Sequence, residues 1–281
     1  MQSIAPVFIV STGRAGSNMF ARALARHAKL FAVHEPVPHL NAEAYARWRG
    51  THSREHILLR LKAKRSNLIE QAGWNGLLYV ESSHYCSHLI RELHELYGAR
   101  FIYLYRDGRD FVRSGLERDR WYGDAPLGRK QVREWAKRWL RHRYLLDIGF
   151  SCDDHKLKPP RSLRSRMEKI TWLWVEVNRT ILESFEDLPA TVTMAVRLED
   201  FGRDVLRDIL AFLGVEAALA VVDDMLIVGE KKPNRTKNRS IPVFEKWSQQ
   251  ETEQFFDLAG PMLSRLGYEP QCDKKYAAEP S

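Results

Sequence analysis

The most informative stretch of the sequence is Val7-Phe8-Ile9-Val10-Ser11-Thr12-Gly13-Arg14-Ala15-Gly16-Ser17-Asn18, in which an apolar strand runs into a glycine-bracketed turn and then a helix. Glycine lets the backbone approach an oxyanion closely, and a helix N-terminus from about Ser17 directs unpaired N–H groups at it. Arg14 adds a fixed positive charge. The stretch therefore predicts a cradle for phosphate or sulfate, built from Thr12, Gly13, Arg14, Ala15, Gly16, Ser17 and Asn18.

This cradle differs from the phosphate loop of nucleotide triphosphatases. That loop has the pattern G-x-x-x-x-G-K-[ST], whereas Gly13 and Gly16 are only three residues apart and no Lys follows Gly16. The difference disfavours a metal-dependent kinase. The alternative interpretation of the stretch is an ordinary strand-to-helix turn, since short motifs recur by chance.

A second cluster of polar residues follows another apolar stretch. Residues 99–105 are expected to form a buried strand, which ends in Arg106-Asp107-Gly108-Arg109-Asp110 and leads into a helix that contains Ser114. The Arg106 guanidinium and the Ser114 hydroxyl predict a second anion site, and two such sites imply a ligand phosphorylated at two places. Open α/β folds bind ligands at the carboxyl ends of their strands, which favours this interpretation over a surface loop tied by charges.

These motifs resemble the sulfotransferase family that uses 3′-phosphoadenosine 5′-phosphosulfate (PAPS). Residues 12–17 look like its 5′-phosphosulfate loop, and residues 106–110 with Ser114 look like its 3′-phosphate site. The similarity continues through Val196-Arg197-Leu198-Glu199-Asp200-Phe201, Trp247 and Leu266-Gly267-Tyr268, so it covers nearly the whole chain. The resemblance implies transfer of a sulfuryl group from PAPS to an acceptor hydroxyl, with adenosine 3′,5′-bisphosphate as product and no metal required.

The sequence also departs from the branch of that family that acts on small molecules in the cytosol. Arg14 stands where that branch has Lys, and its C-terminal R-K-G-x-x-G-x-W-K motif is absent. Arg at this place is usual in the carbohydrate, tyrosylprotein and bacterial branches, so the expected acceptor is a glycan or another small metabolite. Ser82 stands where several branches have Lys.

Three residues are expected to carry the chemistry. Arg14 would stabilise charge electrostatically, because a guanidinium does not give up its proton. Glu35 resembles the Glu of the E-P segment in carbohydrate sulfotransferases, whereas His84 has a spacing similar to the catalytic His of the cytosolic branch. The resemblance favours Glu35 as the base, with His84 as the alternative. Either could instead be structural, Glu35 as a surface carboxylate and His84 as a helix-start residue.

The basic segment 231–240 precedes Trp247, as a corresponding loop does in the family. The resemblance implies that Arg235, Lys237 and Arg239 close over the 3′-phosphate of the nucleotide; the alternative is a solvated loop. The side chains available to stack on the adenine are Trp121, Trp135, Trp172 and Trp174, of which Trp172 and Trp174 are expected to serve the core of their helix.

The pattern of apolar segments predicts an α/β fold: a P-loop-like parallel sheet flanked by helices on both faces, with a helical insertion at about 118–166. The insertion is either a substrate lid or a solvated basic face. A helix ending before Gly267 is expected to pack in the core. The chain of 281 residues, 44% hydrophobic, is expected to form one domain, 1–281. The expected strands are residues 7–11, 31–33, 77–81, 101–105 and 192–197.

Composition constrains the function less than the motifs do. The net charge of +8 favours anionic ligands, although charge alone would equally fit nucleic acid or an acidic membrane surface, and neither is the expected partner. The three cysteines have no C-x-x-C pairing, which disfavours zinc sites and disulfides and fits a reducing compartment. A strand from Val7 leaves no room for a signal peptide, and no apolar run reaches a membrane span, so we expect a cytoplasmic protein or a trimmed domain.

Two other functions remain open at this stage. One is a non-catalytic module that binds a nucleotide or polyanion on its basic face, and the other is a nucleotide or sugar kinase. Tight binding of adenosine 3′,5′-bisphosphate without Mg²⁺ is expected only of the sulfotransferase, whereas a kinase needs ATP with Mg²⁺ and a polyanion binder shows steep salt dependence.

Overall fold

The computed structural model describes residues 5–117, 122, 157–230 and 241–269. Helices and strands alternate along most of this chain. The strands are β1 (Val7–Val10), β2 (Leu30–His34), β3 (Leu78–Ser82), β4 (Arg100–Tyr105) and β5 (Thr193–Arg197). The helices are α1 (Ser17–Leu24), α2 (Asn41–Arg49), α3 (Arg54–Trp74), α4 (Ile90–Tyr97), α5 (Gly108–Leu116), α7 (Arg166–Glu186), α8 (Arg203–Leu213), α9 (Leu219–Glu230) and α10 (Gln249–Arg265). Short 3₁₀ helices are η1 (His84–His88), η2 (Ala190–Val192), η3 (Leu198–Asp200) and η4 (Phe244–Lys246).

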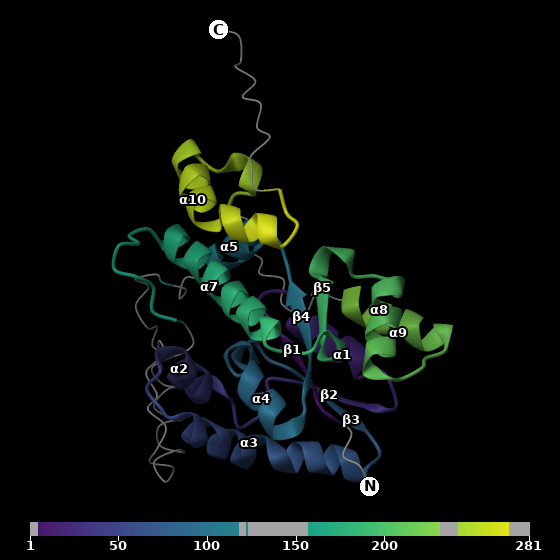
Figure 1. Ribbon diagram of the computed structural model, residues 1–281. Helices are drawn as coiled ribbons and strands as arrows, with labels where there is room; N and C mark the ends of the chain where they lie inside the picture. The colour runs from purple at the N-terminus through teal and green to yellow at the C-terminus, as the bar shows by residue number, and fades with distance from the viewer. Residues whose placement is uncertain (1–4, 118–121, 123–156, 231–240, 270–281) are drawn as a thin grey trace, which may run out of the picture.

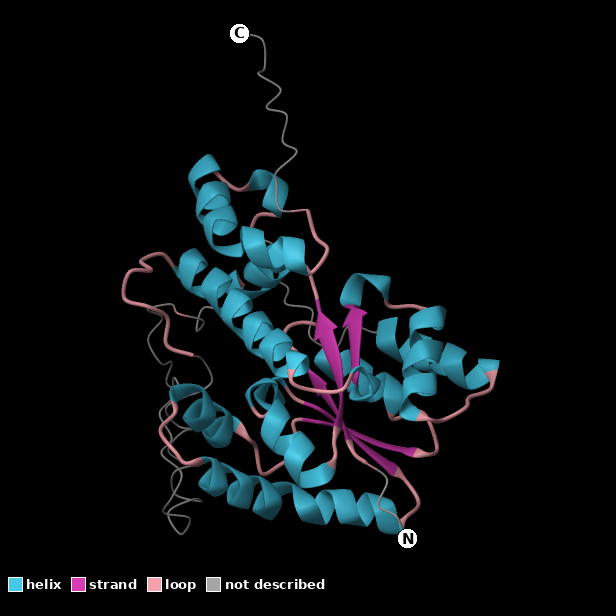
Figure 2. Cartoon of the chain, viewed as in Figure 1, coloured by secondary structure: helices cyan, strands magenta, loops and turns pink. Residues whose placement is uncertain are grey.

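The strands form a parallel five-stranded sheet in the order β2-β3-β1-β4-β5 (Figure 2). The first strand lies in the centre, since it pairs with β3 on one side and β4 on the other. The chain forms β2 and β3 on one side of β1 and then crosses to form β4 and β5 on the other side. This reversal places the carboxyl end of β1 at the point where doubly wound sheets bind their ligands.

Both faces of the sheet are covered by helices (Figure 1). The helices α3, α4 and α7 lie on one side, and α1, α8 and α9 lie on the other. The reason is visible in the strands, whose side chains alternate between two apolar clusters. In β1, Phe8 and Val10 belong to the cluster under α3, α4 and α7, whereas Val7 and Ile9 belong to the cluster under α1, α8 and α9. All four are fully buried.

The predicted α/β fold, a parallel sheet with helices on both faces, is confirmed. Each expected strand is present within one or two residues of its predicted limits, and α10 ends before Gly267 with its apolar residues in the core. Most of the predicted insertion at 118–166 lies outside the described residues. No helix of the described segments is both long and apolar enough to cross a bilayer.

A buried ion pair joins α3 to β3. Arg65 and Glu81 are 1% and 0% exposed, and the Arg65 guanidinium donates to both carboxylate oxygens, at 2.5 and 2.9 Å. Tyr79 donates its hydroxyl to the same carboxylate, and Arg65 also donates to the carbonyl of Pro38, in the loop that follows β2. This network fixes the loop after β2 against the end of β3.

Replacing Arg65 with Met is expected to lower the free energy of unfolding by about 3–5 kcal/mol, because it leaves the Glu81 carboxylate buried without its countercharge. Urea denaturation measures the change. The control is Arg179→Met, which removes a partly exposed partner of Glu176 and Glu183 within α7 and is expected to cost at most about 1 kcal/mol. Equal losses of unfolding free energy in the two variants would contradict the argument that burial makes the Arg65–Glu81 pair the more costly one to break.

Candidate functional site

The candidate site lies at the carboxyl edge of the sheet, where the five parallel strands end together. The glycine loop 11–16 follows β1, Glu35 follows β2, His84 follows β3, and Arg106 follows β4. Because β1 lies between β3 and β4, its loop lies between His84 on one side and Arg106 on the other. The fold thus brings residues from four separate parts of the sequence to one edge.

The loop after β1 turns tightly, and three of its residues have left-handed backbone conformations. Gly13, Arg14 and Gly16 have φ values of 74°, 54° and 81°. At Gly16, a Cβ would lie 2.7 Å from a side-chain carbon of Leu198, so glycine is required there for space as well as for conformation. The backbone N–H of Gly13 donates to the Ser11 hydroxyl at 3.1 Å. Gly16 also caps α1 without any side-chain hydrogen bond to the helix N-terminus, which leaves that terminus suited to an anion.

The two predicted anion sites adjoin each other. Arg14 donates its Nε to the Ser114 hydroxyl at 2.8 Å, and Arg106 donates Nη1 to the backbone carbonyl of Arg14 at 2.8 Å. Arg106 also pairs with the half-exposed Asp110 at 2.9 Å, and its buried Nε has no hydrogen-bond partner among the described residues. Two guanidinium groups and one hydroxyl therefore form a single cationic cluster beside the glycine loop.

Glu35 and His84, the two alternative bases, are in direct contact. The His84 Nδ1 lies 2.7 Å from Glu35 Oε1, although the residues are 49 positions apart in the sequence. Their side chains are 30% and 27% exposed for His84 and Glu35, respectively. The His84 ring also lies against the loop, with its Cγ 3.6 Å from the position of a Cβ on Gly13. The pair therefore flanks the anion cradle on the side opposite Arg106.

The surroundings keep Glu35 ionised. Burial raises the pKa of the Glu35 carboxyl, but the hydrogen bond from His84 and the charges of His84, His34 and His39 outweigh burial and hold that pKa below its ordinary value. An ionised carboxylate only accepts hydrogen bonds, so His84 donates through Nδ1. The other ring nitrogen of His84, Nε2, is then the one that carries a lone pair in the neutral ring.

Glu35 also has an unusual backbone conformation. Its φ is 45°, and among the described residues only Arg14, Glu35 and Tyr122 have positive φ without being glycine. Such conformations cost free energy and persist where the surroundings impose them, often at functional sites. The Glu35 N–H donates to the carbonyl of Ser82, which fixes the residue at the end of β3.

The remaining predicted residues divide into three groups. Thr12, Ala15 and Ser17 are buried within the loop and the first turn of α1, whereas Asn18 is half-buried. Ser82 is buried and donates its hydroxyl to the carbonyl of Ser17, so it braces α1. Outside the described residues lie Arg235, Lys237, Arg239, Trp121 and Trp135.

Three contacts near the site were not anticipated from the sequence. Trp174, fully buried on α7, donates its indole N–H to the carbonyl of Arg106 at 3.2 Å. Glu199 accepts from the backbone N–H of Asp107 at 3.0 Å and from the hydroxyl of Tyr268 at 2.9 Å. Glu199 and Tyr268 do belong to motifs that carry the family resemblance, but the sequence alone assigned them no role. Within the described segments, no cluster of three or more His, Cys, Asp or Glu side chains is arranged to hold a metal ion.

Comparison with known proteins gives structural matches only, since no protein-family model and no curated protein matches the chain. The sulfotransferase domain from the curacin biosynthetic pathway superposes with a TM-score of 0.53 at 16% identity, over 94% of this chain and 98% of that chain. Sulfotransferase STF9 from Mycobacterium avium superposes with a TM-score of 0.52 at 11% identity, over 96% of this chain and 78% of that chain. At these identities the likeness establishes the fold, which this chain shares with bacterial sulfotransferases.

Proposed function

We propose that the protein is a sulfotransferase that moves the sulfuryl group of PAPS to a hydroxyl of a carbohydrate or another small metabolite. The observation that carries the proposal is the arrangement at the end of β1. There the glycine loop lies between a histidine–carboxylate pair on one side and the Arg14–Ser114–Arg106 cluster on the other. A shared fold alone would not support an activity, because one fold serves many functions.

The cationic cluster and the loop suit a nucleotide with phosphates at two positions. Loop N–H groups, the N-terminus of α1 and Arg14 would hold the 5′-phosphosulfate, and Arg106 with Ser114 would hold the 3′-phosphate. The buried Nε of Arg106, without a partner among the described residues, fits a role in binding an anion. PAPS supplies an activated sulfuryl group, and the loss of that group leaves adenosine 3′,5′-bisphosphate.

Although the family resemblance favours Glu35 as the base, we assign the role of general base to His84 and that of positioning residue to Glu35. Glu35 holds the proton of His84 on Nδ1 and orients the ring, so Nε2 is left to take the proton from the acceptor hydroxyl. The acceptor oxygen then forms a bond to sulfur, while the bond from sulfur to the bridging phosphate oxygen breaks. The lowered pKa of Glu35 makes the carboxylate a weak base and a suitable partner for a charged imidazolium.

Arg14 would stabilise the charge that develops on the leaving phosphate. A loose, in-line transfer gains most from fixed positive charge and positioning. The guanidinium of Arg14 is held by the Ser114 hydroxyl and stands on a backbone that is itself fixed by Arg106. Such a preorganised group needs no reorganisation when charge develops.

Calorimetry with nucleotides tests the proposal against its rivals. A sulfotransferase is expected to bind adenosine 3′,5′-bisphosphate tightly without Mg²⁺ and to prefer it to adenosine 5′-phosphate. ATP binding that depends on Mg²⁺ would indicate a kinase, and binding with steep salt dependence and little nucleotide selectivity would indicate a polyanion-binding module. Mass spectrometry of a metabolite and glycan extract incubated with the protein and PAPS then identifies the sulfated acceptor.

The second anion site gives a sharper prediction. Arg106→Ala and Ser114→Ala are each expected to weaken adenosine 3′,5′-bisphosphate binding by about 1.5–3 kcal/mol, roughly 10- to 150-fold, because a charge-assisted contact is lost. Adenosine 5′-phosphosulfate, which lacks the 3′-phosphate, is expected to lose less affinity, because these substitutions remove only the support that Ser114 and Arg106 give to Arg14. Calorimetry of both nucleotides measures this, and equal losses for the two would contradict the assignment.

A further inference from the structure

The peptide group between Arg106 and Asp107 is held from both sides by side chains far away in the sequence. Trp174 of α7 donates its indole N–H to the carbonyl of Arg106 at 3.2 Å. Glu199 of η3 accepts a hydrogen bond from the backbone N–H of Asp107 at 3.0 Å. Both polar groups of the peptide that leaves β4 and enters α5 are therefore satisfied by side chains rather than by regular secondary structure.

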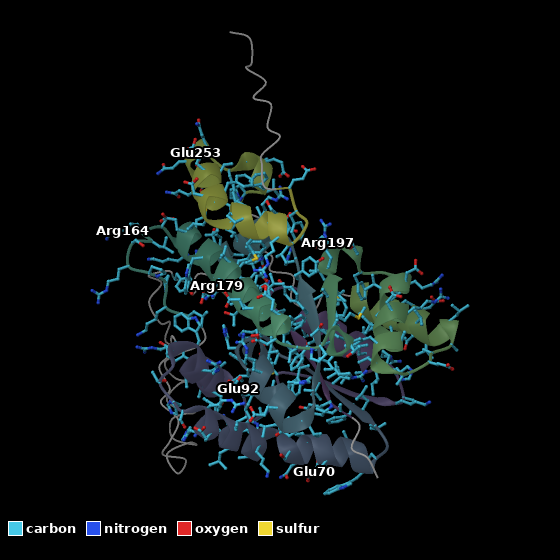
Figure 3. The ribbon with its side chains drawn as sticks, in the orientation of Figure 1. Glu70, Glu92, Arg164, Arg179, Arg197 and Glu253 are labelled. Atoms are coloured by element: carbon cyan, nitrogen blue, oxygen red, sulfur yellow. The ribbon has the colours of Figure 1, made fainter. Side chains whose placement is uncertain are left out.

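Glu199 is in turn held by the segment that follows α10. The hydroxyl of Tyr268 donates to Glu199 Oε2 at 2.9 Å, and the Tyr268 side chain is only 4% exposed. Arg197, which is labelled in Figure 3, lies at the carboxyl end of β5 and contacts both residues. Its guanidinium carbon lies 4.3 Å from the Tyr268 ring centroid, and its Nε lies 3.6 Å from Glu199 Oε2. A continuous set of contacts thus runs from the C-terminal helical region to the start of α5.

The proton of this contact stays on Tyr268. Burial and the adjacent negative charge of Glu199 raise the pKa of the phenol, so Tyr268 remains a donor and Glu199 remains the acceptor. Glu199 therefore presents its other oxygen, Oε1, to the backbone of Asp107 in a fixed orientation.

The peptide held by Trp174 and Glu199 includes the backbone carbonyl of Arg106. Its position determines where the Arg106 side chain begins, and from there Arg106 reaches the carbonyl of Arg14 at 2.8 Å. The next residue, Asp107, caps α5 by accepting from the N–H of Arg109, so the same peptide also sets the start of the helix that carries Ser114. Both members of the second anion site therefore depend on the orientation of one peptide group.

We propose that Glu199 and Tyr268 are positioning residues for this second anion site: they hold the Arg106–Asp107 peptide so that Arg106 and Ser114 receive the 3′-phosphate of the nucleotide. This inference rests on the proposed function, since it takes the 3′-phosphate as the ligand of Arg106 and Ser114. It adds that Tyr268, in the segment that follows α10, contributes to nucleotide selectivity through Glu199.

Tyr268→Phe tests the proposal, because it removes one hydroxyl and leaves the buried ring. The matched control is Tyr103→Phe. Tyr103 is also buried, at 1% exposed, and its hydroxyl donates to Asn178 of α7 at 2.7 Å rather than to Glu199. Both variants lose one hydrogen bond made by a buried tyrosine, so a general loss of stability is common to them. Thermal unfolding verifies that each variant is folded before calorimetry with adenosine 3′,5′-bisphosphate and adenosine 5′-phosphate.

We expect Tyr268→Phe to bind adenosine 3′,5′-bisphosphate roughly 3- to 10-fold more weakly, the equivalent of one lost hydrogen bond, and to bind adenosine 5′-phosphate as the wild type does. Tyr103→Phe is expected to bind both nucleotides normally. Glu199→Gln keeps an oxygen that can accept from the Asp107 N–H. It is therefore expected to retain more of the preference for adenosine 3′,5′-bisphosphate over adenosine 5′-phosphate than Glu199→Ala does.

The outcomes separate this proposal from the proposed function. If the wild type shows no preference for the nucleotide with a 3′-phosphate, the proposed function fails, and the positioning role fails with it. If the wild type shows that preference and Tyr268→Phe keeps it in full, only the positioning role is overturned. Equal losses for both nucleotides in Tyr268→Phe, or the same loss of preference in Tyr103→Phe, would likewise show a structural role alone.

Discussion

Replacement of His84 by Asn is expected to lower the turnover of sulfuryl transfer by roughly 10²- to 10⁴-fold, the usual contribution of a positioned general base. Asn carries an amide that can still donate to Glu35 Oε1, so the variant removes Nε2 of the ring and preserves the contact that holds the side chain in place. The affinity for adenosine 3′,5′-bisphosphate is expected to stay unchanged, because no phosphate contact is assigned to His84. Initial-rate measurements with PAPS and the identified acceptor provide the test.

The Glu35→Gln variant and the double variant distinguish the two members of the pair. Gln keeps the shape of Glu35 but loses the charge that favours imidazolium, so a smaller loss than that of His84→Asn is expected. Because the two residues act as a unit, the double variant is expected to be no worse than His84→Asn alone. His94→Asn is the control: this ring contacts the carbonyl of Ala99, just before the amino end of β4 and away from the site. An inactive Glu35→Gln variant together with a normally active His84→Asn variant would instead indicate that Glu35 is the base.

The central strands β1, β3 and β4 were predictable because they are buried on both faces, whereas the edge strands β2 and β5 are only partly buried. A parallel strand such as β4 packs apolar side chains against both helical layers, so its sequence is a short continuous apolar run with a polar end. The glycine loop was predictable for a different reason, since positive φ at Gly13 and Gly16 favours glycine, and a Cβ at Gly16 would also collide with Leu198. Local sequence was therefore sufficient for the strands and for the turn that follows β1.

The contacts within the site were not predictable in the same way, because they depend on the order of the strands. The sequence offered Glu35 and His84 as alternatives, and only the adjacency of β2 and β3 brings them within 2.7 Å. Likewise, Arg14 and Ser114 are 100 residues apart and meet because β1 pairs with β4. Pairing between parallel strands is a long-range choice that a local pattern does not specify.

The same limit applies to Glu199. Its motif carries part of the resemblance described above, yet its partners, the Asp107 N–H and the Tyr268 hydroxyl, lie 92 and 69 residues away. Nothing near Glu199 in the sequence indicates a backbone amide as its partner. Polar residues that position a site through other residues are recognised only once the elements are packed together.

Replacement of Arg14 by Ala is expected to reduce turnover by roughly 10²- to 10³-fold, the effect of removing one preorganised group that stabilises developing charge. Ala retains a Cβ at a backbone position with φ of 54°, so the loop carries the same conformational cost in both proteins and the fold is expected to persist. The loss is expected in kcat, because the charge of the leaving phosphate develops only in the transition state, and it is expected to be larger in kcat/KM, because Arg14 also holds the 5′-phosphosulfate of the bound substrate. Steady-state kinetics with PAPS as the varied substrate measures both constants.

Two further variants test whether turnover depends on the placement of the Arg14 guanidinium or only on positive charge near the loop. Arg14→Lys keeps the positive charge but not the planar group that donates Nε to Ser114 at 2.8 Å, so turnover is expected to lie between those of the wild type and Arg14→Ala. Arg22→Ala removes an exposed positive charge from the last turn of α1, the helix that begins just after the loop, and is expected to leave turnover unchanged. A fully active Arg14→Ala variant would contradict the proposed mechanism at its central residue. A loss of activity in Arg22→Ala equal to that in Arg14→Ala would mean that net charge at this edge of the sheet, rather than the placement of Arg14, governs turnover.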